Sequence, residues 1–198
     1  MRPLQITSAA NPLIRQVIAV KDKPGSSREG AFLVEGPHLI ETALRSGAHI
    51  ERILFTAGFG RKHEWQKLIR RLLKEVSPAS AGSPEGTVIE VSEQVFTRLS
   101  DTETPQGILA VIALPTATLD GLQFRATPLL AVCDGIQDPG NLGTIVRAAD
   151  AAGADAVVIM PNTCSPYNSK AIRATAGSLF NISVVRSDAE DLLRLLMR

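Results

Sequence analysis

The chain has 198 residues, of which 44% are hydrophobic and 21% are charged, a composition that supports a buried core and excludes wholesale disorder. No stretch approaches the ~18 consecutive apolar residues of a membrane helix, and the N-terminus lacks the apolar run of a signal peptide. We therefore expect a cytoplasmic protein with one large domain or two small ones.

Charge is unevenly distributed along the chain. Residues 1–76 carry 13 Lys/Arg and 7 Asp/Glu, a net charge of +6, whereas the remaining 122 residues have a net charge of −5. A basic segment is typical of a module that binds a polyanion, because Lys and Arg displace counterions from phosphates. An ordinary solvated surface explains the same charge, so both interpretations stay open.

Strand and helix patterns alternate over the first 114 residues and predict one small α/β unit. Asn11 and Pro12 predict a helix start, because Asn caps helices and Pro fits the first helical position. A strand at 31–35 precedes a helix that begins at Pro37 and ends before Gly47. The other expected elements are strands at 52–56, 87–91 and 108–114, helices at 63–76 and 93–99, and a loop at 77–86.

The rest of the chain predicts a parallel sheet. We expect a linker at 115–128, because it holds two prolines and a glycine and shows no clear period. Further along, we expect a buried strand at 129–134, a turn at 138–141, an amphipathic helix ended by Gly153 and a strand at 156–160. We then expect a helix after Asn168, a strand at 181–185 and a last helix with a Ser187/Glu190 capping box. Three strands joined by helices imply right-handed crossovers.

Glycines cluster where the strand at 129–134 meets the following helix. Ligands bind beyond the carboxyl ends of strands in open α/β sheets, and Gly140 removes bulk where a group could approach the backbone. A helix N-terminus here could hold a phosphate. The spacing of Gly135, Gly140 and Gly143 fits neither a dinucleotide fingerprint nor a P-loop, which disfavours a dehydrogenase or a nucleotidase.

Two longer motifs carry a family resemblance that covers nearly the whole chain. The string PGNLGTIVRAADAAGAD, at 139–155, resembles the first motif of the SpoU (TrmH-like) RNA 2′-O-ribose methyltransferases of the SPOUT superfamily, and SPYNSKAIRATAGSLFNISV, at 165–184, resembles the second. FLVEG at 32–36 and TPQGILAV at 104–111 resemble that family's N-terminal RNA-binding domain, which is similar to ribosomal protein L30e.

The resemblance implies an α/β fold in two domains. An L30e-like substrate-binding domain at 1–114 is followed by the linker and, at 129–198, by the parallel-sheet start of a trefoil-knot methyltransferase domain. It further implies S-adenosylmethionine as cofactor, a homodimer, and methylation of ribose 2′-hydroxyls in rRNA or tRNA. No metal is needed, because the sulfonium is already a good leaving group. Cysteines 133 and 164 lack metal-ligand spacing, and we expect them to be reduced and buried.

The family's third motif, an Asn-Glu-Gly turn with a Ser-Leu-Asn segment, has no match after Val185. We therefore expect the chain to stop before the knot, with an incomplete cofactor site whose residues stay unassigned. This leaves two hypotheses, a methyltransferase and an RNA-binding module that lacks activity.

The resemblance assigns catalysis to Arg147, often described as the base for the ribose hydroxyl. Because a guanidinium stays charged in proteins, we expect Arg147 to grip a phosphate and stabilise a developing alkoxide, although a solvated helix arginine is the plain alternative. Asn141 is expected to help build the active site, or simply to cap the helix.

RNA binding is expected at basic side chains in both domains. Lys170 and Arg173 share a helix face, which is either solvated or directed at RNA phosphate. The full set is Arg15, Lys21, Lys23, Arg70, Arg71, Lys170 and Arg173. The three histidines show no ligand spacing. We expect Trp65 and Tyr167 to be isolated aromatics that form no stacking platform, although Tyr167 could touch a base.

Overall fold

The computed structural model describes residues 3–25, 30–76 and 88–197. The chain forms two compact units, Met1–Leu114 and Pro115–Arg198. The loop expected at 77–86 lies outside the described residues. None of the helices in the described ranges has the length and apolar character needed to span a bilayer.

The first unit is built on a mixed five-stranded sheet with the order β1-β4-β3-β5-β2. Strands β1, β4 and β3 run parallel, and β5 pairs antiparallel with both β3 and β2. The elements are β1 (Leu4–Ile6), α1 (Pro12–Asp22), β2 (Ala31–Glu35), α2 (Pro37–Arg45), β3 (Ile50–Thr56), α3 (Ala57–Gly60), η1 (His63–Trp65), α4 (Gln66–Glu75), β4 (Val88–Val91), α5 (Glu93–Leu99) and β5 (Ile108–Ala113).

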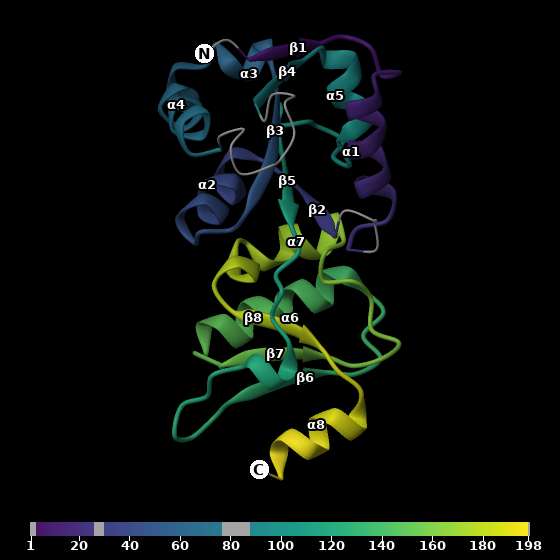
Figure 1. The fold of residues 1–198 in the computed structure, drawn as a ribbon, viewed down its shortest axis with the longest axis vertical. Coiled ribbons are helices and arrows are strands. Elements are labelled where there is room, and N and C mark those ends of the chain that lie inside the picture. Colours follow the sequence, from purple (N-terminus) through teal and green to yellow (C-terminus); the bar gives the residue numbers. More distant parts are fainter. Residues whose placement is uncertain (1–2, 26–29, 77–87, 198) are drawn as a thin grey trace. The chain divides into compact units, whose positions relative to one another are not determined.

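Helices cover both faces of this sheet. Figure 1 shows α1 and α5 on one face and α2 and α4 on the other. On the first face, Ile14 and Val17 of α1 and Phe96 of α5 pack against Leu54 and Leu109 of the strands. Burying these side chains supplies the hydrophobic stabilisation of the unit, at about 25 cal/mol per Å² of apolar surface.

Short-range capping signals place the helices of the first unit. The side chain of Asn11 accepts a hydrogen bond from the Leu13 amide, and Pro12 is the first residue of α1. Ser92 likewise caps α5 by accepting from the Val95 amide. The helix start predicted from Asn11 and Pro12 is confirmed, and α5 occupies the predicted residues 93–99. The structure adds β1 and α3, which were not expected, and divides the expected helix at 63–76 into η1 and α4.

The second unit has a three-stranded parallel sheet with the order β6-β7-β8, which confirms the predicted parallel arrangement. The elements are η3 (Leu119–Gly121), β6 (Leu130–Cys133), α6 (Pro139–Ala151), β7 (Ala156–Ile159), α7 (Ser169–Thr175), η4 (Ser178–Phe180), β8 (Ser183–Arg186) and α8 (Ala189–Leu196).

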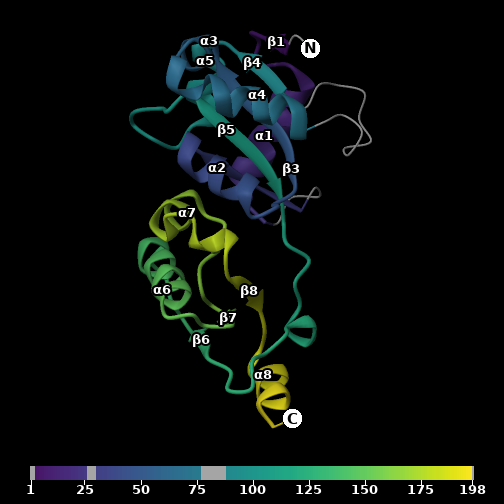
Figure 2. The same cartoon turned by 90° about the vertical axis from the view of Figure 1, so that its left-hand side faces the viewer.

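The central strand β7 is buried on both faces. Val157 and Ile159 pack with Val146 of α6, whereas Val158 packs on the opposite face with Leu192 of α8. Figure 2 shows α6 and α7 on one side of this sheet and α8 on the other. The alternation follows from the two-residue period of a strand.

Three local expectations for the second unit were wrong. Residues 115–128 are not a separate linker, because Leu119 is buried in this unit's core and Arg125 forms an ion pair with Asp155 at 2.7 Å. Strand β6 is not fully buried, since it is an edge strand and Val132 is 49% exposed. Asp188, not Ser187, caps the last helix.

Candidate functional site

The first motif forms the junction between β6 and α6. The Asp138 carboxylate accepts a hydrogen bond from the backbone N–H of Asn141 at 2.9 Å, and Pro139 occupies the first helical position. Residues 138–141 are thus the start of the helix, not the separate turn that was expected. Asn141 does not cap α6, because Asp138 does.

An ion pair joins the first motif to the second. The Lys170 ammonium donates to the Asp138 carboxylate at 2.6 Å, and Asn168 caps α7 by accepting from the Lys170 amide. The hydrogen bond from Lys170, with that from the Asn141 amide, holds the pKa of Asp138 below its ordinary value. Lys170, a predicted RNA-binding residue, is exposed but already paired in this structure.

Helix α7 packs closely on α6 at Gly143. A Cβ at this position would lie 2.3 Å from the Ala171 carbonyl oxygen and 2.6 Å from the Ala174 methyl carbon. At Gly140 the nearest groups are the flexible side chains of Asp138 and Lys170. The group that approaches the backbone at Gly140 is therefore part of this chain.

Helix α6 presents an exposed polar stripe that includes both predicted catalytic residues. Asn141, Thr144 and Arg147 are all exposed, and the first and last are about 9 Å apart along the helix axis. Among the residues that the structure describes, no hydrogen bond or ion pair engages the side chain of Asn141 or Arg147. Both side chains are available to an external ligand, as is the exposed Arg173 on α7.

The loops that follow β6 and β7 are held together at the carboxyl edge of the sheet. The Thr163 hydroxyl donates to the Cys133 carbonyl at 3.0 Å and accepts from the Ile136 amide at 3.3 Å. The Cys164 amide donates to the Ile136 carbonyl at 2.8 Å. This edge is where open α/β sheets bind ligands.

Titratable groups near these loops are shielded from solvent. Cys133 is buried and Cys164 is half-buried, and both are free, so the expectation of burial holds fully for Cys133 alone. Burial raises the pKa of both thiols and of the Tyr167 phenol. Over the described ranges, no group of three His, Cys, Asp or Glu side chains could hold a metal ion.

The predicted RNA-binding residues of the first unit do not form one surface. Arg15 and Lys23 are exposed at α1, whereas Arg70 and Arg71 belong to α4 on the other face of the sheet (Figure 1). Arg71 also pairs with Glu75 at 2.8 Å. An RNA that contacts one face of this unit would therefore meet either the α1 side chains or the α4 side chains.

Lys21 is engaged within the fold. Its ammonium donates to the carbonyls of Arg98 at 2.9 Å and Ser100 at 3.0 Å, and it pairs with Asp101 at 3.1 Å. These contacts fix the end of α5 to α1, a role that sequence spacing does not reveal.

Trp65 is not the isolated aromatic that was expected. Its ring stacks on that of Phe59 with centroids 6.0 Å apart, and the centroid of the His38 ring lies 5.2 Å from that of Trp65 in a T-shaped arrangement. His38 and Trp65 are far apart in the sequence, so only tertiary folding brings them together.

Comparison with known proteins assigns this architecture. Residues 11–110 match the model of the MRM3-like substrate binding domain, and residues 128–197 match that of the SpoU rRNA Methylase family. A solved RNA 2′-O ribose methyltransferase is 31% identical, with 69% of it covered and a TM-score of 0.74. The chain belongs to the SpoU rRNA methylase family.

Curated relatives within the SpoU family act on ribosomal RNA. The chain is 36% identical to the 23S rRNA (guanosine(2553)-2′-O)-methyltransferase RlmP of Bacillus subtilis, over 92% of this chain and 64% of the relative. It is 33% identical to the human mitochondrial rRNA methyltransferase 3, over 85% of this chain and 38% of the relative. The chain thus spans less than two thirds of these relatives.

Solved SpoU-family structures share the fold of this chain. An rRNA methyltransferase from Sinorhizobium meliloti superimposes with a TM-score of 0.83 at 27% identity, covering 100% of this chain and 70% of that one. Its AdoMet-bound form gives a TM-score of 0.80 and covers 98% and 68%. Arg147 and Asn141 fall within the segment that matches the SpoU model, and Trp65 falls within the substrate-binding segment.

Proposed function

We propose that the SpoU-family protein that carries this sequence transfers a methyl group from S-adenosylmethionine to a ribose 2′-oxygen of ribosomal RNA. The observation that carries the proposal is Arg147, an exposed guanidinium without a partner in the described residues, on the helix that follows the glycine-containing junction of the sheet. The names of the relatives and the AdoMet-bound neighbours support the substrate and the cofactor.

The residues of this chain would position and stabilise, while the bound sulfonium supplies the methyl group. Arg147 can hold an RNA phosphate with two parallel hydrogen bonds and stabilise negative charge that develops on the 2′-oxygen. Because the guanidinium is already protonated, the hydroxyl proton must leave to another acceptor, such as water. The exposed amide of Asn141, one turn before Thr144, would orient the ribose.

The same proposal includes RNA as partner, a homodimer and a cytoplasmic location. The MRM3-like substrate binding domain would supply RNA affinity, with Arg15 and Lys23 or the α4 arginines as phosphate contacts. Lys170 and Arg173 would extend the contact in the second unit. The relative from Bacillus subtilis supports a bacterial ribosomal substrate, while mitochondrial relatives also exist.

A second candidate is an RNA-binding module that does not catalyse transfer. It is favoured by the edge strand β6, where Val132 is 49% exposed and pairing is described on one side only, and by Leu129 just before this strand, which is 48% exposed. The AdoMet-bound neighbours also extend beyond the matched part, of which this chain covers 68% and 66%. The cofactor site of those enzymes therefore need not be complete within these residues.

The test is transfer of labelled methyl from S-adenosylmethionine to ribosomal RNA, followed by digestion to nucleosides. A labelled 2′-O-methylnucleoside that disappears with Arg147→Ala supports the enzyme. Salt-dependent RNA binding without transfer supports the module. Label on a base, or neither binding nor transfer, would contradict both candidates.

A further inference from the structure

Trp65, Phe59 and His38 form an aromatic group at one corner of the first unit. Phe59 is buried, Trp65 is half-buried and His38 is exposed, so the group runs from the core to the solvent. The Trp65 ring is nearly parallel to that of Phe59, at 12°, and His38 meets it edge-on, at 82°. The Trp65 ring thus contacts a buried ring on the inside and an exposed ring on the outside.

A loop held by Glu35 lies beside this aromatic group. The Glu35 carboxylate accepts hydrogen bonds from the Ser100 hydroxyl at 2.7 Å, the Thr102 hydroxyl at 3.0 Å and the backbone N–H of Gln106 at 3.0 Å. Three bonds to one carboxylate anchor both ends of the segment 100–106. The loop is therefore ordered before any ligand arrives.

The loop presents the side chain of Gln106 against Gly36, at the start of the helix that carries His38. A Cβ on Gly36 would lie 2.8 Å from the Gln106 amide oxygen, and Gly36 has a φ of +105°. The next residue, Gly107, faces Phe59, because a Cβ there would lie 3.0 Å from the Phe59 Cβ. The contacts therefore link Gln106, the aromatic group and the start of α2 into one surface.

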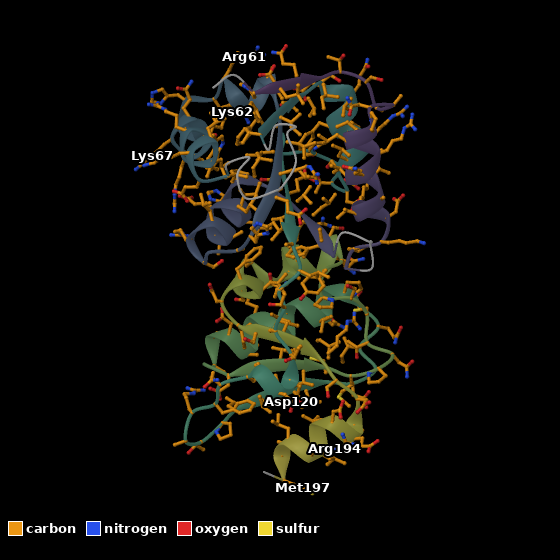
Figure 3. The ribbon with its side chains drawn as sticks, in the orientation of Figure 1. Arg61, Lys62, Lys67, Asp120, Arg194 and Met197 are labelled. Atoms are coloured by element: carbon orange, nitrogen blue, oxygen red, sulfur yellow. The ribbon has the colours of Figure 1, made fainter. Side chains whose placement is uncertain are left out.

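Basic side chains flank this surface. Figure 3 shows Arg61, Lys62 and Lys67 at the corner of the first unit formed by α3 and α4. All three are exposed, and none of their side chains forms a hydrogen bond or ion pair with another described residue. In the segments 57–67 and 100–106 the acidic residues are Glu64, Asp101 and Glu103. Asp101 is paired with Lys21, so the three cations outnumber the two remaining carboxylates.

We propose that this surface binds an unpaired nucleotide of RNA, with the base on the rings and the phosphates on the cations. The aromatic-basic surface is defined as His38, Arg61, Lys62, Trp65, Lys67 and Gln106. The inference rests on the proposed function in one respect, that the partner is RNA.

The chemistry favours an unpaired base over a duplex. Rings that lie at the surface with flanking Lys and Arg are typical of sites where a splayed base stacks, because every base has a π-face. A duplex hides its base faces and would contact the cations alone. The Gln106 amide offers both donors and an acceptor, so it can bond to the edge of a stacked base.

The experiment uses Trp65 as its own reporter, because it is the only tryptophan in the chain. The whole chain is titrated, without S-adenosylmethionine, with an RNA hairpin that has an unpaired loop and with a blunt RNA duplex of the same length. We expect the hairpin to quench the tryptophan fluorescence to saturation and the duplex to leave it nearly unchanged.

Variants then assign the contact by anisotropy of labelled hairpin. Trp65→Ala should weaken binding by about 5- to 150-fold, the range for loss of one stacked base, whereas Trp65→Phe should keep most of the affinity. His38→Ala and Gln106→Ala change exposed side chains, so they carry the test if Trp65→Ala does not fold.

Charge is tested with a matched control. Replacing Arg61, Lys62 and Lys67 by Ala should reduce the slope of log affinity against log salt by about 2, since each single-strand phosphate contact contributes about 0.7. Arg45→Ala removes an exposed cation at the far end of α2 and should leave the slope unchanged.

Three results would overturn the proposal. They are equal quenching by duplex and hairpin, no quenching by either RNA, and normal hairpin affinity in the His38→Ala and Gln106→Ala variants. Absence of methyl transfer would contradict only the proposed function, because the titration contains no cofactor.

Discussion

Gly140 and Gly143 lie one turn apart on α6, yet an added methyl group would meet different neighbours at the two positions. At Gly143 it would meet the backbone of α7, with the Ala171 oxygen 2.3 Å away. At Gly140 it would meet the Asp138 oxygen at 2.9 Å and the Lys170 Cε at 3.3 Å, which are parts of flexible side chains. The space at the two glycines is therefore limited by different groups, by backbone at Gly143 and by side chains at Gly140.

We predict that Gly143→Ala lowers the free energy of unfolding by about 1–3 kcal/mol, because α6 and α7 must move apart. Gly140→Ala is the matched control and should change it by less than about 1 kcal/mol, since side chains can rotate away and Ala favours helix. Urea unfolding of both variants checks this. Equal losses would show that the backbone contact at Gly143 is not the reason for glycine.

Arg147 gives the second prediction at the residue scale. Assayed in the active polypeptide that carries this sequence, Arg147→Ala should reduce single-turnover methyl transfer by about 10²–10³-fold, as when one charge-stabilising donor is lost. Arg147→Lys should recover little, because an ammonium cannot replace a planar fork. Affinity for S-adenosylmethionine, measured in parallel, should change little. A near-normal rate would mean that Arg147 is an ordinary solvated helix residue.

At the scale of elements, the Asp138–Lys170 pair couples α6 to α7, and its contribution depends on pH. The folded state lowers the pKa of Asp138, mainly through the hydrogen bond from Lys170. A carboxyl group with a lowered pKa binds its proton more weakly in the folded state. Its contribution is therefore present above the ordinary value of 3.8 and is lost as pH falls through the lower, folded value.

We predict that Asp138→Asn is less stable than the parent at pH 7 and that this difference shrinks below about pH 4. Asparagine also caps helices well, so the change isolates the charge. The effect should be small, since the pair is exposed. Thermal unfolding between pH 3 and pH 7 measures it. Lys170→Met should show the same pH profile, and additive losses in the double variant would contradict direct pairing.

Capping and burial patterns differ in how far the sequence predicts them. The starts of α1 and α5 follow from Asn11 and Ser92, because a cap involves only residues two or three positions away. The burial of β6 does not follow from its apolar composition, since the order β6-β7-β8 puts this strand at an edge. Strand order is a property of the whole sheet.

At the scale of the whole molecule, the two units carry different parts of the proposed function. The unit Met1–Leu114 contains the segment that matches a substrate-binding model, and the unit Pro115–Arg198 contains the segment that matches the SpoU model. Affinity for RNA and affinity for cofactor are thus separable measurements.

We predict that a polypeptide of these 198 residues binds S-adenosylmethionine about tenfold or more weakly than the Sinorhizobium meliloti enzyme solved with AdoMet. The reason is that these residues cover 68% of that AdoMet-bound enzyme and that the edge of β6 is exposed. Isothermal titration of both proteins under one buffer condition makes the comparison. Micromolar binding by the 198-residue polypeptide would mean that its own loops suffice for the site.

The sequence alone determined the family, the α/β class and most element positions, because these depend on residues that are close together in the chain. The glycine-containing first motif and the second motif are contiguous strings. Helix α7 begins after Asn168, as its sequence predicts, whereas α6 begins after Asp138, within the residues expected to form a turn. Charge counts indicated a basic first segment, although not which cations share a surface.

Tertiary structure alone decided the roles of several individual side chains. It places the Lys21 ammonium at the end of α5 and packs Gly143 against the backbone of α7. It also brings Trp65 into contact with His38 and Phe59. Each of these contacts joins residues from different elements, and their geometry depends on how those elements pack. Short-range sequence patterns contain no information on such distances, which is why the aromatic group was expected to be an isolated tryptophan.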